Sequence, residues 1–295
     1  TLFLVITVAF FVVRLAPGGP FDQEMTLSPE IRANLEAAYG LDAPVWVQYG
    51  RYLKGLLHGD FGPSFRYRDF TVTELIRRGL PVSLTIGFLA LLLAMTGGIA
   101  AGCVAALNRD RWIDPFVMAI AISGMILPLL VVAPLLQLVF GVVLGWLPVS
   151  GWRAGALDDL VLPVVTLALP LMAYIARLMR GSMLEVLASS FIRTARAKGL
   201  PWRRVILRHA LPPALLPVVS YLGPASAMVL TGSLVVESLF GLPGSGRYLI
   251  EGALNRDYTL VLGMTVVVAA LTLGLNLVAD LIYAWLDPRV RLAAG

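Results

Sequence analysis

Residues 81–107 read PVSLTIGFLALLLAMTGGIAAGCVAAL and contain no Asp, Glu, Lys or Arg. A bilayer core about 30 Å thick needs about 20 apolar residues in a helix, so this stretch is long enough to cross a membrane. The rest of the chain has the same character: 58% of its 295 residues are hydrophobic, 14% are charged, and the mean hydropathy is +0.84. Soluble domains carry roughly 25% charged residues. The composition therefore predicts an all-α membrane protein.

Four further uncharged stretches are long enough to span a bilayer: 115–152, 160–176, 210–236 and 258–279. The first of these is too long for one helix, and its Gly and Pro residues predict that it leaves the membrane near residue 142. The chain opens on a shorter uncharged run, 1–13, which is expected to belong to a truncated first helix; a signal peptide is the alternative. We therefore expect six transmembrane helices, at 1–13, 81–107, 115–142, 160–176, 210–236 and 258–286.

The distribution of Lys and Arg predicts the orientation of these helices. Six spans place the loops 108–114 and 177–209 and the tail after 280 on one side, where twelve basic residues gather. The short loops on the other side have only Arg153, Arg247 and Arg256. Since cytoplasmic loops carry the excess of Lys and Arg, both termini and the 177–209 loop are expected in the cytoplasm of a bacterial inner membrane.

The long segment 14–80 is expected outside the cell membrane as a small extracytoplasmic cap. It has eight basic and eight acidic residues, and its length makes charge a poor guide to its side. Helical patterns near Ser28–Tyr39 and Ala43–Leu57 suggest that it folds. Residues 81–295 would then form the permease core.

The 177–209 loop and its flanks, residues 176–217, read ARLMRGSMLEVLASSFIRTARAKGLPWRRVILRHALPPALLP. Eight basic residues and one acid lie within the loop. Arg193 to Lys198 can form a short helix that Gly199 ends, and a second helical stretch leads to Pro212. A basic anchor for lipid headgroups is the simpler reading, but it would not need the ordered Gly and Pro residues.

This loop resembles the cytoplasmic loop of binding-protein-dependent ABC importer permeases. The family pattern is Glu-Ala-Ala, three residues, Gly, nine residues, Ile, one residue and Leu-Pro. The chain matches it at Ala195, Gly199, Leu211 and Pro212, and departs from it at Arg193, Thr194 and His209. The strings RTARAKGL, RLAPGGPF, HGDFGPSF, GALNRDY and DPRVR are similar to the peptide and nickel branch, especially its oligopeptide-type B subunits.

The resemblance implies a type I ABC importer permease fold and a loop that couples the membrane helices to an ATPase subunit. The coupling residues would be Arg193, Thr194, Ala195, Arg196, Ala197, Lys198, Gly199, Leu200, Leu211 and Pro212. It also implies four kinds of partner besides membrane lipid: a second permease subunit in a heterodimer, two ATPase subunits that hold ATP and Mg, and an extracytoplasmic peptide-binding protein. Nothing points to nucleic acid.

The chain carries no sign of its own catalysis. It lacks the Gly-x-x-x-x-Gly-Lys-Ser/Thr loop that cradles ATP phosphates, and its two histidines, His58 and His209, are predicted on opposite sides of the membrane. No metal site, cofactor site or catalytic set is expected. The single Cys103 allows no intrachain disulfide.

Small polar residues on the last two helices are the candidates for a translocation path. On the last helix Thr265, Thr272 and Asn276 share one face with Asp280. On the preceding stretch Ser220 aligns with Thr231, and Ser226 with Ser233. These residues would line a water-filled path, or they would only pack helix against helix.

We therefore interpret the chain as a non-catalytic permease subunit of an ATP-driven importer of peptides, with oligopeptides as the expected substrate. The same machinery could serve dipeptides, nickel or a peptide-like antibiotic. An ion-driven secondary transporter is a further alternative, but it would show matching halves and acidic residues at mid-membrane.

Overall fold

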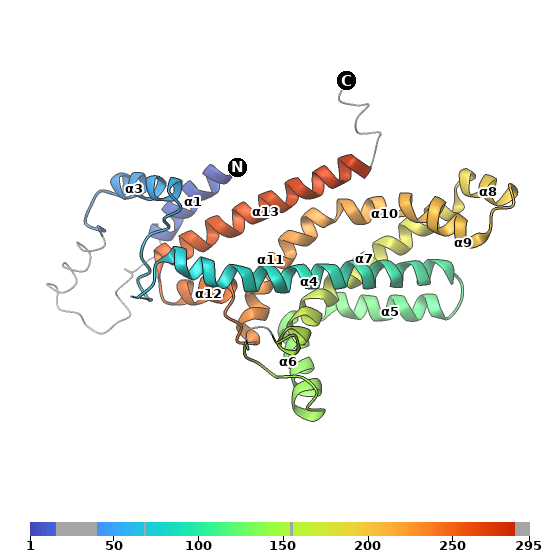
Figure 1. Cartoon of the computed structure of the whole chain (residues 1–295), viewed down its shortest axis with the longest axis horizontal. Helices are drawn as coiled ribbons and strands as arrows, with labels where there is room; N and C mark the ends of the chain where they lie inside the picture. Colours follow the sequence, from blue (N-terminus) through green and yellow to red (C-terminus); the bar gives the residue numbers. More distant parts are fainter. Residues whose placement is uncertain (16–39, 68, 154–155, 287–295) are drawn as a thin grey trace, which may run out of the picture. The chain divides into compact units, whose positions relative to one another are not determined.

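The computed structural model describes residues 1–15, 40–67, 69–153 and 156–286 of the chain (Figure 1). Apart from an isolated bridge between Pro63 and Thr71, the regular structure of these residues is helical. The helices are α1 (Leu2–Leu15), α3 (Val45–Leu57), α4 (Val72–Leu107), α5 (Ile113–Ile126), α6 (Leu129–Leu136), the π-helical η1 (Gln137–Val143), α7 (Asp158–Ala188), α8 (Ser190–Ala197), α9 (Trp202–Arg204), the π-helical η2 (Val205–Ala210), α10 (Leu211–Ser220), α11 (Leu222–Leu239), α12 (Ser245–Leu254) and α13 (Tyr258–Leu286). The expected helix near Ser28–Tyr39 and the DPRVR string lie outside the described residues.

Three helices are long and apolar enough to cross a membrane: 72–107, 158–188 and 258–284. A fourth span is reached if the pair α5 and α6–η1, bent by 108°, counts as one. The chain is therefore an all-helical protein with several apolar spans. By length and composition the described helices give three or four spans, whereas six were expected. The difference comes from α1, which has 14 residues, and from the break between α10 and α11.

Helix α4 begins at Val72, nine residues before the expected start at residue 81. The cause is a capping box: the Thr71 amide donates to Glu74 Oε2 at 2.8 Å, and the Glu74 amide donates to Thr71 Oγ1 at 3.2 Å. This reciprocal pair satisfies amides that a helix start leaves open. Pro81 then lies inside the helix, which membrane helices tolerate. The expected boundary between cap and core at residue 80 falls within one continuous helix.

The expected helix 115–142 is two helical segments that meet at Pro128. Leu127 is extended (φ −73°, ψ 122°), as is usual for a residue before proline. The second segment ends at Val143, one residue beyond the predicted exit, and Gly145 follows with a positive φ of 62°. The bend of 108° makes this stretch either a broken span or a re-entrant loop.

The other predicted boundaries also shift. Helix α7 continues for twelve residues beyond Ala176, so the first third of the expected 177–209 loop is helical. The predicted span 210–236 is divided at Tyr221 into α10 and α11. The last helix, α13, has the expected bounds of 258–286.

The chain divides into two compact units, residues 1–83 with 243–271 and residues 84–242 with 272–295. In the first unit, Val72, Leu75 and Ile76 of α4 are buried against Leu260 and Met264 of α13. The described part of the 14–80 segment therefore shares a hydrophobic core with α13.

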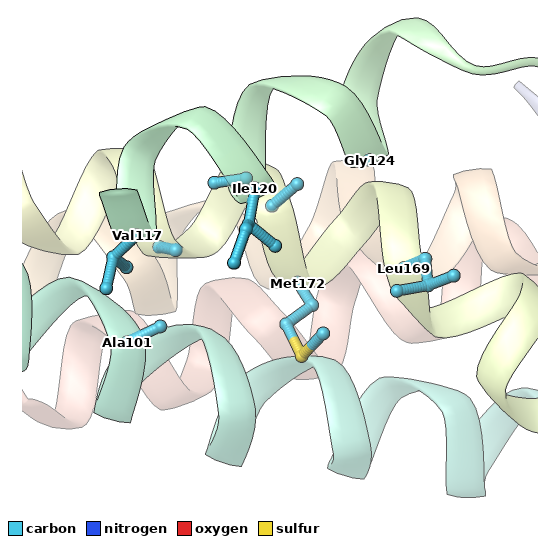
Figure 2. Close-up of a pocket in the computed structure, with 9 residues that line it drawn as sticks. Ala101, Val117, Ile120, Gly124, Leu169 and Met172 are labelled. Atoms are coloured by element: carbon cyan, nitrogen blue, oxygen red, sulfur yellow. The ribbon is translucent and has the colours of Figure 1, made fainter. Parts of the chain in front are cut away.

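In the second unit, glycines on α4 allow close packing against α7. A Cβ built on Gly102 would lie 2.5 Å from the backbone oxygen of Ala176, and one on Gly98 would lie 2.8 Å from Ile175. These two glycines form a Gly-x-x-x-Gly pair, the spacing that brings membrane helices together. Further along, α4, α5 and α7 enclose a cavity of about 240 Å³ lined only by apolar side chains and glycine, with Val117, Leu169 and Met172 among them (Figure 2).

Candidate functional site: a basic helix with a glycine cap

Helix α8 is a short basic helix that follows α7 after a single extended residue. Ser189 has φ −69° and ψ 156°, which ends α7 and starts α8 at Ser190. Ile192 and Ala195 are buried, so one face of α8 is fixed against the rest of its unit. The other side is exposed, and it carries the predicted coupling residues Arg193, Thr194, Arg196, Ala197 and Lys198.

Gly199 ends this helix in a Schellman motif. Its amide donates to the carbonyl of Arg196 at 2.9 Å, and the Leu200 amide donates to the carbonyl of Ala195 at 3.4 Å. This pattern requires a left-handed residue at the first position after the cap, and Gly199 has φ +75°. A Cβ at Gly199 would meet nothing within 4 Å. The conformation therefore needs glycine, while the surface over it stays open.

The chain after Gly199 returns toward the same unit. Pro201 is extended and caps α9, and the guanidinium carbon of Arg196 lies 5.2 Å from the centre of the Trp202 ring. Val205 is buried at the start of η2. Leu211 and Pro212 belong to the following helix α10, where Leu211 is half-buried and Pro212 is exposed. The structure thus brings Arg193 to Leu200 together in one helix and turn, and places Leu211 and Pro212 on a separate element.

The positive charges of this segment have no acidic partner within the described part of the chain. No ion pair there involves Arg193, Arg196 or Lys198, although Arg180 pairs with Asp114 and Arg153 with Asp158 and Asp159. One face of α8 is buried and anchors the helix, so its exposed cations are free to bind a partner surface that carries acidic groups.

The predicted path residues have different environments. Ser226 and Ser233 are buried, and their hydroxyls donate to the carbonyls of Gly223 and Leu230 in their own helix. Thr265 is half-buried and donates to Val261. Thr272 and Asn276 are half-exposed and Ser220 is exposed. Thr231 lies on α11, and its side chain is outside the described part. Because α10 ends at Ser220, the expected alignment of Ser220 with Thr231 runs across a helix break.

A polar cavity between α7 and α10 was missed by the sequence reasoning. It has a volume of about 300 Å³ and is lined by residues that include Tyr174, Arg177, Ser182 and Glu185. The Tyr174 ring stacks on Tyr221 with centroids 4.2 Å apart. The helical spacing of Tyr174, Arg177, Ser182 and Glu185 could have shown a shared face, had α7 been extended beyond Ala176.

A second missed feature is a hydrogen-bonded junction around the buried Asp257. Its Oδ2 accepts from the Ser64 hydroxyl at 2.5 Å and from the amides of Phe65 and Arg66 at 2.9 and 3.1 Å. Its Oδ1 accepts from the Leu260 amide and so caps α13. Ser64 belongs to the HGDFGPSF string and Asp257 to GALNRDY. Two strings that carry the family resemblance therefore form one structural unit.

Next to this junction, Glu251 accepts hydrogen bonds from the Tyr67 hydroxyl and from Arg247 Nε. Burial raises the pKa of Glu251, but the hydrogen bonds from Tyr67 and Arg247 outweigh it and leave that pKa below its usual range. Burial and the bond to Glu251 raise the pKa of Tyr67. The cluster holds α12 against the segment after α3.

Comparison with known proteins identifies the family. A model of the family described as "Binding-protein-dependent transport system inner membrane component" matches residues 98–292, about two thirds of the chain. The chain belongs to this family. It is accordingly a multi-pass component of the inner membrane, a permease subunit without catalytic activity, as the sequence predicted. Such a transport system works with a binding protein and an ATPase, which are the partner classes of this permease.

Curated relatives of this permease extend over nearly its full length. It is 54% identical over 291 residues to the oligopeptide transport system permease protein OppB of Escherichia coli (strain K12), covering 99% of this chain and 95% of the relative. It is 52% identical to OppB of Haemophilus influenzae over 99% of this chain and 95% of the relative. The dipeptide transport system permease protein DppB of Bacillus subtilis is 40% identical, with 99% and 94% covered. The permease is thus an OppB homologue, and the predicted branch is confirmed.

Solved structures agree on the fold. A chain from the inward-facing MetNI methionine ABC transporter superposes with a TM-score of 0.61 at 19% identity, covering 72% of this permease and 96% of that chain. A chain of an amino acid ABC transporter crystallised with histidines gives a TM-score of 0.52 at 20% identity, with 74% and 94% covered. The ABC importer permease fold is therefore confirmed. Among the described residues, no group of three His, Cys, Asp or Glu side chains could hold a metal ion.

Proposed function

We propose that this permease moves oligopeptides across the inner membrane into the cytoplasm. The observation that carries the proposal is the 54% identity to OppB over 99% of the chain, against 40% and 36% to two dipeptide permeases. The permease pairs with a second permease subunit and two ATPase subunits that bind ATP and Mg. An extracytoplasmic binding protein delivers the peptide.

Coupling to ATP hydrolysis passes through α8 and its glycine cap. The helix is supported from within its unit by Ile192 and Ala195, so a push on its outer face is passed on to α7 and η2, which contact it. Its cations Arg193, Arg196 and Lys198, which form no ion pair within the described part of the chain, face outward for an acidic cleft on the ATPase. Leu200 turns back to Ala195 through the Schellman motif, which keeps the end of the helix rigid. Leu211 and Pro212 connect this segment to α10.

In the membrane we propose six crossings with both termini in the cytoplasm. Helix α1, which is short for a membrane span, forms the first crossing. Helices α10 and α11 together form the fifth crossing, with α11 continuing α10 past Tyr221. The cap segment, residues 14–80, lies outside the cytoplasm together with α12. This arrangement agrees with the Lys and Arg distribution, because α8, α9 and η2 carry Arg193, Arg196, Lys198, Arg203, Arg204 and Arg208 on the cytoplasmic side.

The proposed path uses the polar groups that the chain leaves accessible. These are the polar cavity on α7 and the side chains of Ser220, Thr272 and Asn276, which are exposed or half-exposed, whereas Ser226 and Ser233 are buried. In the cavity, Arg177 and Glu185 are eight residues apart on α7, which is about 12 Å along a helix. A cation and a carboxylate at this separation suit a short peptide with both termini charged.

The test is uptake of defined peptides by the complete transporter. With the cognate binding protein present, tri- to pentapeptides should be transported with ATP hydrolysis, and the ATPase and second permease should copurify with this chain. Transport of dipeptides alone, or of nickel, would replace the oligopeptide assignment. Transport that persists after inactivating mutation of the ATPase would point to an ion-driven carrier.

A further inference from the structure

Near the end of α1, Arg14 and Tyr52 line a small cavity, and each has a buried hydrogen-bond donor without an acceptor among the described residues. Arg14 Nε and Nη2 both donate to Gln48 Oε1, at 3.2 and 2.8 Å. Arg14 Nη1 and the Tyr52 hydroxyl are buried, and neither has a hydrogen-bond partner among the described residues. A buried polar group without a partner costs about 1–3 kcal/mol, and more when it is charged. Among the described residues, these two donors therefore lack an acceptor.

The cavity next to these donors has a volume of about 120 Å³. It is lined by residues of α1, α3 and the start of α13, among them Phe10, Arg14, Arg51, Tyr52 and Thr259. Two arginines and a tyrosine thus line one small space. Water could accept the hydrogen bonds, but it would not compensate the charge of Arg14, which has no acidic partner within the described residues.

Packing holds both donors in place. The guanidinium carbon of Arg14 lies 3.7 Å from the centre of the Phe10 ring, and the Tyr52 ring lies 5.7 Å from that ring. The Gln48 amide is anchored by donating to the carbonyls of Leu41 and Ala43. Burial raises the pKa of Tyr52, so its hydroxyl keeps the proton that it can donate. The donors are preorganised for an anion.

The surroundings indicate which anion is at hand. Helices α1 and α3 lie side by side (Figure 1). Helix α1 exposes an apolar stripe of Leu4, Val8, Val12 and Leu15, and α3 exposes Trp46 near its start. Exposed apolar stripes on a membrane protein face lipid tails, and Trp concentrates at the headgroup level. The Arg14 end of α1 is thus where a bilayer presents its phosphates.

We propose that Arg14, Arg51 and Tyr52 form a binding site for the phosphate of a phospholipid headgroup. Arg14 Nη1 and the Tyr52 hydroxyl donate to the phosphate oxygens, and Arg51 closes the open side of the cavity. The lipid tails lie along the exposed stripe of α1. The site gives a role to the arginine of the RLAPGGPF string, which the transport mechanism leaves unused.

The test measures lipid binding by native mass spectrometry of the assembled transporter in detergent. Three probes separate the sources of the anion: dioctanoyl-phosphatidylglycerol, dioctanoylglycerol with the same tails but no phosphate, and inorganic phosphate. The phosphatidylglycerol should bind at a discrete site, and dioctanoylglycerol should not. If inorganic phosphate binds and phosphatidylglycerol does not, the anion is free phosphate and the proposed lipid site is refuted.

Two variants and one control locate the site. Tyr52→Phe removes only the hydroxyl, and Arg14→Gln removes the charge; each should weaken phosphatidylglycerol binding about tenfold, the usual effect of losing a hydrogen bond to a charged group. Lys54→Gln removes an exposed cation on α3 that does not line the cavity, and it should leave binding unchanged. Equal lipid binding by wild type, Tyr52→Phe and Lys54→Gln would refute the proposal. So would variants that keep lipid but lose docking of the binding protein, because the anion would then be a protein carboxylate.

Discussion

The Ser64 hydroxyl donates a hydrogen bond of 2.5 Å to the buried carboxylate of Asp257, across 193 positions of the sequence. The same oxygen accepts from two backbone amides, so Asp257 fixes the path of the chain before α4 against the start of α13. Ser64 is 1% exposed and Asp257 is fully buried, which means that water cannot replace these bonds.

Replacing Asp257 should therefore destabilise the first unit. Asp257→Asn replaces one carboxylate oxygen with an NH2 group, which cannot accept a hydrogen bond. Either the bonds from Ser64, Phe65 and Arg66 or the bond from Leu260 is then lost. We expect a loss of about 2–4 kcal/mol in the free energy of unfolding, measured by thermal unfolding of the purified transporter. Asp42→Asn, at an exposed position in the same unit, is the control. Equal stability of the two variants would contradict the role of Asp257.

A second prediction concerns the ion pair between α5 and α7. Arg180 Nε and Nη2 each donate to Asp114 at 2.6 Å, and the Asp114 side chain is only 7% exposed. Arg180→Ala leaves this carboxylate without its partner and should cost about 2–3 kcal/mol.

A double-mutant cycle separates the pair from its surroundings. Arg180→Ala combined with Asp114→Asn should recover part of the loss, giving a coupling energy of about 1–3 kcal/mol. The exposed pair Arg109–Asp110, with a separation of 3.6 Å, should give less than about 1 kcal/mol. Additive effects for Arg180 and Asp114 would show that their bond contributes little.

The glycines of the second unit give a third prediction. Gly102→Ala would place a Cβ 2.5 Å from the backbone oxygen of Ala176, so α4 and α7 would have to separate. A cost of about 1–3 kcal/mol is expected. Gly181→Ala is a matched control, because a Cβ at this helical position meets nothing within 4 Å and alanine favours the helix. Thermal unfolding should rank Gly181→Ala at or above wild type and Gly102→Ala well below it.

The fourth prediction is a pH dependence from Glu251. Its pKa in the folded protein lies below the ordinary value of 4.5, so the folded state binds fewer protons than the unfolded state between these two values. The stabilisation is fully present above pH 4.5 and is lost as the pH falls through the lowered pKa. Glu251→Gln should flatten the fall in unfolding temperature below pH 4.5. An unchanged slope in that variant would exclude Glu251 as its source.

The sequence predicted those parts of the fold that have a local cause. Helix α13 has the expected bounds, and Gly199 ends α8 as expected, because a left-handed glycine cap is a local signal. Thr71 and Glu74 give a local signal for the start of α4 as well, whereas the uncharged stretch alone predicts a start at residue 81. The break at Tyr221 also has a local signal, because Gly223 and Pro224 follow it and Pro224 has no amide to donate to the carbonyl of Ser220.

The parts that could not be predicted depend on contacts between distant residues. No periodicity joins Ser64 to Asp257, or Arg14 to Tyr52, and no motif indicates that the carboxylate of Asp114 will meet Arg180. The polar cavity on α7 depends on the helix continuing past Ala176, where the basic residues predict a loop. Hydropathy and charge predict that the chain is a membrane protein, whereas these residue pairs come together only when the helices pack.

The central claim is that the glycine-capped helix α8 passes ATP-driven motion to the permease. The most direct measurement compares peptide uptake and ATP hydrolysis in reconstituted transporter carrying Gly199→Leu or Gly145→Leu. Both glycines have positive φ angles, +75° and +62°, and both have open space at the Cβ position, so the backbone strain is matched. We expect Gly199→Leu to lower uptake at least tenfold while ATP hydrolysis and binding-protein docking persist, and Gly145→Leu to keep both activities. Normal uptake by Gly199→Leu would contradict the claim.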